Sequence, residues 1–134
     1  MASIHKEIAI EASGEKVWEV VRDIGAVHER FVPGLVTNVR LEEGARIVTF
    51  SNGMVVRELI VDIDDERRRF AYAAVGEMFK HHNASMQVFD DGPGRCRLLW
   101  ITDLLPDEAA SDVRKIIDQG ASIMKQTLDR KDDA

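Results

Sequence analysis

The chain has 134 residues, of which 45% are hydrophobic and 31% are charged, and its formal net charge is −6. A chain of this length and composition is typical of one folded domain with a real core, and it is too short for a separate cofactor-binding domain. The negative charge, with basic residues scattered among acidic ones, argues against nucleic acid and against stable membrane association. We therefore expect one domain over residues 1–130, followed by a frayed, charged tail at residues 131–134.

The cysteine content and the N-terminus bear on the compartment. Cys96 is the only cysteine, so no internal disulfide can form. Residues 1–6 lack the basic segment followed by an apolar one that a secretory signal requires. Both features favour a cytoplasmic location.

The first part of the chain predicts one strand and two short helices. Residues 4–10 alternate apolar and polar side chains, as a half-buried strand does. Residues 15–23 place their apolar side chains at helical spacing, and Ser13 before them is a suitable N-cap. A second helical segment over residues 27–31 ends at Pro33 and Gly34.

The rest of the chain predicts a sheet and a long helix. Between residues 35 and 104 the apolar period is two and turn signals recur, which is typical of antiparallel strands joined by hairpins. After Pro106 the period changes and predicts a helix of about 20 residues that begins at Asp107 or Glu108. We expect an α+β fold in which a curved antiparallel sheet of about seven strands wraps around this helix. A cone-shaped sheet with its long helix at the N-terminus is the alternative, but here the longest apolar helix comes last.

Residue parity in each strand predicts which side chains face the helix. In residues 35–41 the odd positions are apolar, so Leu41 is expected to point inward. In residues 54–63 both faces carry apolar residues, and the inward face is undecided. The inward side chains expected from the last three strands are Phe70, Tyr72, Ala74, His82, Ala84, Met86, Val88, Leu98, Trp100, Thr102 and Leu104.

Small residues face one another across the expected interior. Thr37, Ala74 and Ala84 are among the small side chains on the sheet, and Gly120 and Ala121 oppose them on the helix. A close-packed interior normally alternates large with small groups. Either the helix approaches the sheet closely at Gly120, or a cavity is left between them, and the curvature of the sheet favours a cavity.

Several segments occur in an order that is informative together. They are residues 17–23, 28–34, 50–53, 56–59 and 64–68, Trp100 with residues 104–106, and Gly120. Together they resemble the SRPBCC superfamily of START-like and birch-pollen-allergen-like proteins. Within it, the segments are most similar to bacterial polyketide cyclase/dehydrase-like proteins and plant abscisic-acid-receptor relatives.

The resemblance implies a helix-grip fold with an internal cavity for a hydrophobic or amphipathic ligand, and with neither a metal nor an organic cofactor. In the receptor relatives a strand glutamate lies in the pocket, and Glu58 matches it by register. Residues 50–54 and 76–81 match the two loops at the mouth of that pocket.

Glu58 and His82 are the candidates for chemistry. A carboxylate on an apolar wall can move a proton or anchor a ligand hydroxyl, and an imidazole titrates near neutrality. The alternative for Glu58 is an outward side chain paired with Arg67 or Arg97. The residues expected to contact a ligand are His28, Phe31, Val56, Glu58, Tyr72, His82, Met86, Trp100, Gly120 and Met124. No metal site is expected, because neighbours such as His81 and His82 point to opposite faces of a strand.

Three functions remain open from the residues. The first is binding of a lipid-like, aromatic or polyketide-like molecule in the cavity. The second is a polyketide cyclase or dehydratase that uses Glu58 or His82 as a general acid or base. The third is a regulatory protein that presents Met54, Met78 and Phe79 to a partner. Whether the protein is an enzyme, and whether it forms a homodimer, is left open.

Overall fold

The computed structural model describes residues 1–129, and its helices and strands follow the expected order. The elements are β1 (Ala2–Ile10), α1 (Gly14–Val21), α2 (Val27–Arg30), β2 (Val36–Glu42), β3 (Ala45–Phe50), β4 (Val55–Asp64), β5 (Arg69–Val75), β6 (His81–Asp90), β7 (Cys96–Leu105), the 3-10 helix η1 (Asp107–Ala109) and α3 (Ala110–Leu128). The long helix therefore starts with a 3-10 turn. The expected tail, residues 131–134, lies outside the described residues.

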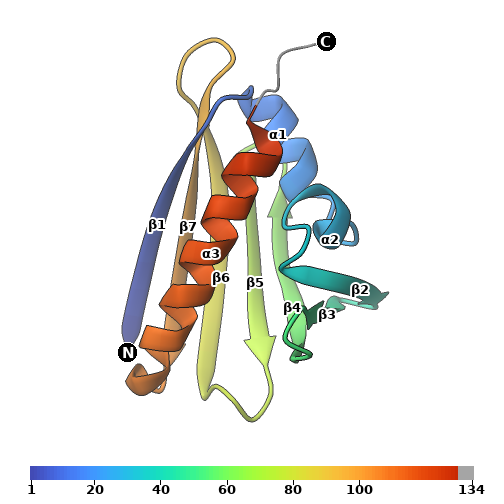
Figure 1. Cartoon of the computed structure of the whole chain (residues 1–134), viewed down its shortest axis with the longest axis vertical. Helices are drawn as coiled ribbons and strands as arrows, with labels where there is room; N and C mark the ends of the chain where they lie inside the picture. The colour runs from blue at the N-terminus through green and yellow to red at the C-terminus, as the bar shows by residue number, and fades with distance from the viewer. Residues whose placement is uncertain (130–134) are drawn as a thin grey trace.

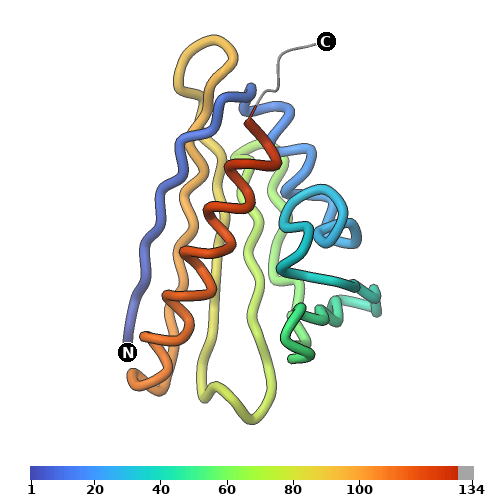
Figure 2. Tube along the Cα trace, viewed as in Figure 1, coloured from blue at the N-terminus to red at the C-terminus, as the bar shows by residue number. Residues whose placement is uncertain are grey.

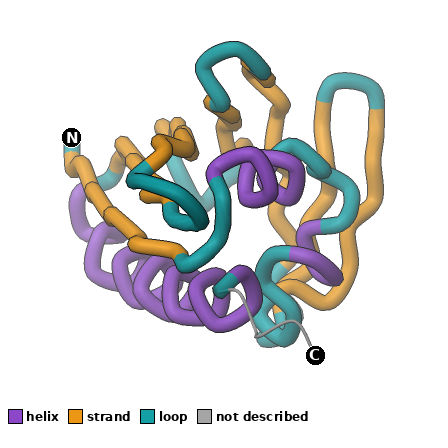
Figure 3. Tube along the Cα trace, turned by 90° about the horizontal axis from the view of Figure 1, so that it is seen from above, coloured by secondary structure: helices purple, strands orange, loops and turns teal. Residues whose placement is uncertain are grey.

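The seven strands described within residues 1–129 form one antiparallel sheet in the order β1-β7-β6-β5-β4-β3-β2 (Figure 1). Strands β2 to β7 pair with their neighbours in the chain, and β1 pairs with β7 as the edge strand opposite β2. Register shifts in β2, between Val36 and Asn38, and in β4, between Ile60 and Asp62, add local twist. Seen from above, the strands follow a curve around the helices (Figure 3). The predicted α+β helix-grip fold is confirmed.

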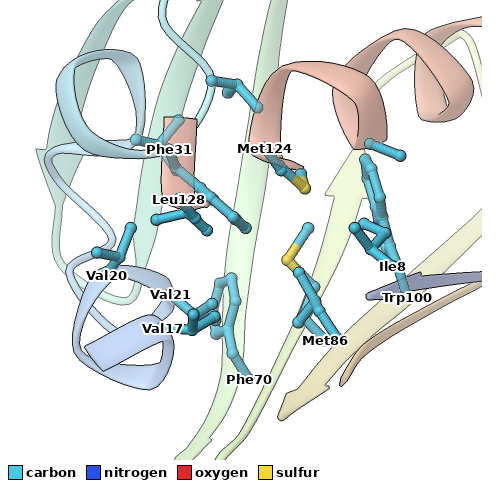
Figure 4. Packing of buried hydrophobic residues seen from close by; sticks show 14 of the residues in the cluster. Ile8, Val17, Val20, Val21, Phe31, Phe70, Met86, Trp100, Met124 and Leu128 are labelled. Atoms are coloured by element: carbon cyan, nitrogen blue, oxygen red, sulfur yellow. The ribbon is translucent and has the colours of Figure 1, made fainter. Parts of the chain in front are cut away.

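Helix α3 crosses the sheet obliquely, from the start of β1 at the lower end to α1 at the upper end (Figures 1 and 2). Its apolar face is buried against the sheet, as the helical period predicts. Met124 of α3 and Met86 of β6 point toward one another in this interior (Figure 4). Among residues 1–129, no helix combines the length and the hydropathy needed to cross a membrane.

Helix α1 closes the upper end of the interior. Ser13 caps it by accepting a hydrogen bond from the backbone N–H of Lys16 at 3.2 Å, as predicted. Its apolar side chains Val17 and Val21 are fully buried, and Figure 4 shows them beside Phe70 of β5. Within residues 1–129, no comparable helix closes the lower end of the interior.

The parity expected for residues 35–41 holds at its end and is wrong at its start. Leu41 lies directly opposite Arg46 in the register, so it shares the inner face with that cavity-lining residue, although it is 56% exposed near the end of this edge strand. At the start, Val36 is buried and lines the cavity, whereas Thr37, expected to point inward, is exposed. The register shift after Val36 breaks the simple alternation, so one parity does not hold along the strand.

Candidate functional site

A cavity of about 450 Å³ lies between the inner face of the sheet and the helices. Its walls come from β2 to β7, from α1, α2 and the segment after α2, and from η1 and α3. Pockets of about 300–1,000 Å³ are typical of small-molecule sites. The expected cavity is therefore present, and it has the size of a ligand site.

The cavity reaches the surface at the lower end of the sheet. Exposed Asn52 and Met78 line it there, from the β3–β4 and β5–β6 connections. Phe79 follows Met78, and Asp112 in the first turn of α3 completes the rim. Figure 2 shows the β5–β6 connection at this end, away from α1. A ligand can enter between these segments without opening the sheet.

A buried ion pair stands on the cavity wall. Arg46 of β3 and Glu58 of β4 are directly opposite in the sheet, and Arg46 Nε donates to Glu58 Oε1 at 2.8 Å. Their side chains are only 5% and 11% exposed. Arg46 Nη1 donates to the Ile24 carbonyl oxygen at 3.1 Å, and the guanidinium carbon lies 5.1 Å from the centre of the Phe70 ring. Each charge is held in place by its partner.

This geometry decides the orientation of Glu58. The side chain points into the cavity, so the outward alternative is wrong. The two arginines named as its outward partners pair with other acids: Arg67 Nη1 lies 2.9 Å from Asp64 Oδ2, and Arg97 Nη1 lies 3.6 Å from Glu7 Oε1. The sequence reasoning missed Arg46. A signal was available, because Arg46 shares its strand face with apolar Val48 and Phe50, and a charge in such a row needs a buried partner.

Tyr72 and Trp100 form a second polar pair, deep in the cavity. Trp100 Nε1 donates to the Tyr72 hydroxyl oxygen at 3.3 Å. Burial raises the pKa of Tyr72 above its usual range, and the nearby Glu58 carboxylate raises it further. The hydroxyl therefore keeps its hydrogen, which is not donated to any acceptor in the described part of the chain.

His82 lies nearer the mouth, between two aromatic rings. Its ring centre is 4.9 Å from that of Phe79 and 6.3 Å from that of Tyr72. Its Nδ1 accepts a long hydrogen bond, 3.4 Å, from the backbone N–H of Ala74. Burial lowers the pKa of His82, since the charged imidazolium is disfavoured in this apolar site. The ring is neutral near pH 7, with its hydrogen on Nε2.

We expect His82 to make the fold less stable in mild acid. Because the pKa of His82 is lower in the folded chain than in the unfolded chain, unfolding takes up a proton below about pH 6.5. The stability is complete above that pH and is lost as the pH falls through the folded-state value. Urea unfolding measures this effect: between about pH 7.5 and about pH 5, the free energy of unfolding should fall less for His82→Gln than for the wild type.

His5→Gln, at an exposed position, is the matched control and should lose as much stability as the wild type. An equal loss in the wild type and in His82→Gln would contradict the burial of a neutral imidazole.

The cavity lining includes all the residues predicted to contact a ligand except His28 and Gly120. Those that line it are Phe31, Val56, Glu58, Tyr72, His82, Met86, Trp100 and Met124. They come from α3, from the residue after α2, and from strands β4 to β7. These elements are distant in the chain, and only the folded sheet brings their side chains together.

Gly120 and His28 lie elsewhere. An ideal Cβ on Gly120 would be 3.3 Å from Trp100 Cζ3 and 3.4 Å from Leu35 Cδ2, so the helix approaches the wall closely at this point. The close approach and the cavity therefore occur together: α3 contacts Trp100 at Gly120, and Ile117 and Met124, on either side of Gly120, line the cavity. His28 Nε2 is 3.3 Å from Glu29 Oε1, and its buried Nδ1 has no hydrogen-bond partner within residues 1–129.

Comparison with known proteins agrees with this fold. The family described as "Polyketide cyclase / dehydrase and lipid transport" matches residues 1–129. The chain belongs to this family, and the resemblance to the SRPBCC superfamily is confirmed. A search of the curated proteins found no match.

Several solved structures share the fold. XoxI from Bacillus cereus is 19% identical with a TM-score of 0.86, over 96% of each chain. The di-domain ARO/CYC protein BexL, from the BE-7585A biosynthetic pathway, is 12% identical with a TM-score of 0.82, over 96% of this chain and 46% of that one. Norcoclaurine synthase from Thalictrum flavum is 17% identical with a TM-score of 0.72, over 95% of this chain and 93% of that one. At these identities the likeness shows a common fold.

Proposed function

We propose that this chain binds a small hydrophobic or amphipathic molecule, lipid-like, aromatic or polyketide-like, in the cavity between the sheet and α3. The observation that carries the proposal is the cavity itself, about 450 Å³ in volume and lined mainly by apolar side chains. An empty apolar cavity lowers stability, because the groups around it lack contacts on one side. A ligand of matching shape would restore those contacts.

The family supports the same proposal. Its description names polyketide cyclases, dehydrases and lipid transport, all of which handle molecules with large apolar parts. The net charge of −6 and the lone cysteine, Cys96, support placing this function in the cytoplasm, with neither nucleic acid nor a membrane as a stable partner.

A binding screen tests the proposal. Naphthalene derivatives and medium-chain alcohols should raise the melting temperature, because a ligand that binds only the folded state stabilises it by RT ln(1 + [L]/Kd). Native mass spectrometry should show one bound molecule. If no probe shifts the melting temperature, the proposal is wrong.

A pair of variants on β5 locates the binding. Ala74 is buried and lines the cavity, while Ala73 points to the other face of the sheet. Ala74→Phe should fill the cavity and abolish binding. Ala73→Phe adds the same ring outside and should leave binding unchanged. Equal binding by both variants would place the ligand elsewhere.

The second candidate is a polyketide cyclase or dehydratase that works in the same cavity. The observation in its favour is His82, a neutral imidazole on the cavity wall that can take up a proton. Glu58 is less available for this role, because Arg46 holds it. If the protein cyclises a poly-β-ketone, His82→Gln should stop turnover and leave probe binding intact. Full turnover in His82→Gln would exclude this histidine as the base.

A further inference from the structure

We propose that the Arg46–Glu58 pair makes the cavity selective for neutral ligands over carboxylates, and that Tyr72 donates its hydroxyl hydrogen to a carbonyl or hydroxyl oxygen of the ligand. The inference rests on the proposed binding function and names the chemical class of its ligand. It excludes free fatty acids and aromatic acids, and it favours aromatic ketones and phenols.

The charges on the cavity wall give the first argument. Within the described residues, Arg46 is the only cationic side chain that lines the cavity, since His82 is neutral. The charge of Arg46 is already balanced by Glu58, with 2.8 Å between Arg46 Nε and Glu58 Oε1. The remaining charged residue of the lining, Asp112, is an acid at the mouth. The wall therefore offers no free positive charge to an anion.

The energetics of burial give the second argument. A carboxylate that leaves water needs a counter-ion and hydrogen bonds in the protein. Here the ligand could obtain a counter-ion only by drawing Arg46 away from Glu58, which would then be buried without a partner. Arg46 is also held by the Ile24 carbonyl oxygen and packed against Phe70. A neutral ligand disturbs none of these contacts.

The Tyr72–Trp100 pair gives the positive part of the recognition. The Tyr72 hydroxyl accepts the hydrogen of Trp100 Nε1 at 3.3 Å, and its own hydrogen is available to an acceptor on the ligand. A carbonyl or hydroxyl oxygen can serve as that acceptor. Phe70 stacks on Tyr72 at 5.2 Å between ring centres, and these rings suit a planar apolar body. The flexible side chains of Met86 and Met124 can adapt to its edge.

Matched naphthalene probes test the selectivity. At about pH 7, 2-naphthol and 2-acetylnaphthalene are neutral, whereas 2-naphthoate is an anion of nearly the same shape. We expect the wild type to bind the two neutral probes at least about tenfold more tightly than 2-naphthoate, measured by titration calorimetry.

Glu58→Gln should remove this preference. The change keeps the side-chain shape, removes the negative charge and frees the charge of Arg46 for a ligand carboxylate. Affinity for 2-naphthoate should rise by at least about tenfold, while affinity for 2-naphthol changes little. Glu42→Gln is the matched control, since Glu42 is paired with Arg57 at 3.5 Å on the surface, and it should change neither affinity.

Tyr72→Phe tests the donor. The change should weaken the binding of 2-acetylnaphthalene by about tenfold and leave the affinity for unsubstituted naphthalene unchanged, because only the ketone accepts a hydrogen bond. Equal affinity of the wild type and Tyr72→Phe for the ketone would overturn the role of this hydroxyl.

The outcomes separate the inference from the proposed function. Binding of neutral probes together with equal or tighter binding of 2-naphthoate by the wild type would overturn the selectivity and leave the binding function standing. Failure of every probe to bind would overturn both. If Glu58→Gln does not fold, the double variant Arg46→Met/Glu58→Leu, which has no buried charge, should still prefer 2-naphthol; a preference for 2-naphthoate would contradict the inference.

Discussion

Replacing Arg46 by methionine should destabilise the fold by about 3–5 kcal/mol, the usual loss when one partner of a buried ion pair is removed. The variant leaves the buried Glu58 carboxylate without the guanidinium that balances it. It also removes the hydrogen bond that Arg46 Nη1 donates to the Ile24 carbonyl oxygen. Urea unfolding at neutral pH measures the change.

Two variants show whether burial is the cause. Arg57→Met removes an arginine from the neighbouring strand whose pair with Glu42 is exposed, and it should cost less than about 1 kcal/mol. Arg46→Met/Glu58→Leu removes both buried charges and should recover most of the stability that Arg46→Met loses. Similar losses for Arg46→Met and Arg57→Met would contradict the burial of the pair.

Leu98→Ala should cost about 3–4 kcal/mol, whereas Met124→Ala should cost about 2 kcal/mol or less. Both side chains are buried, with exposures of 0% and 2%. Leu98 is surrounded by core atoms, but Met124 lines the cavity and already lacks contacts on one side. Deleting Met124 therefore enlarges an existing void, and deleting Leu98 creates a new one.

The same urea experiment compares the two variants in the absence of ligand. Losses of equal size would mean that the atoms around Met124 are as closely packed as those around Leu98. The cavity would then be collapsed in solution, contrary to this structure.

Most of the fold could be predicted from the sequence because hydrophobic period is a local property. The change from period two to helical spacing after Pro106 separates the sheet from α3, and the hairpin turns give the order of the strands. The parity of β2 could not be predicted throughout. The register shift after Val36 depends on how β2 meets β3, and nothing in the local sequence pattern around Thr37 reveals it.

The candidate site could be predicted only in part. The family resemblance pointed to Glu58, and parity placed Tyr72, His82 and Trp100 on the inner face, where they line the cavity. Parity could not decide β4, since both of its faces carry apolar side chains. Arg46 was missed for a related reason, because a charge on an inner face is explained only by the partner opposite it in the register.

The place of Gly120 also needed the folded structure. A glycine on an apolar helix face is compatible with a cavity wall or with a close helix-to-sheet contact, and the distance between the two elements decides. Here Trp100 fills the space beside Gly120, and the cavity opens toward the lower end of the same helix.

Methionine methyl resonances provide the most direct test that the cavity binds an apolar ligand. Four of the five methionines, Met54, Met78, Met86 and Met124, line the cavity, and Met1 does not. In a ¹³C-methyl-methionine sample titrated with 2-naphthol, the resonances of Met86 and Met124 should shift most, because these side chains face one another inside (Figure 4). Met1 should not move. Saturable shifts confined to Met1, or no shift at any methionine, would contradict the proposed site.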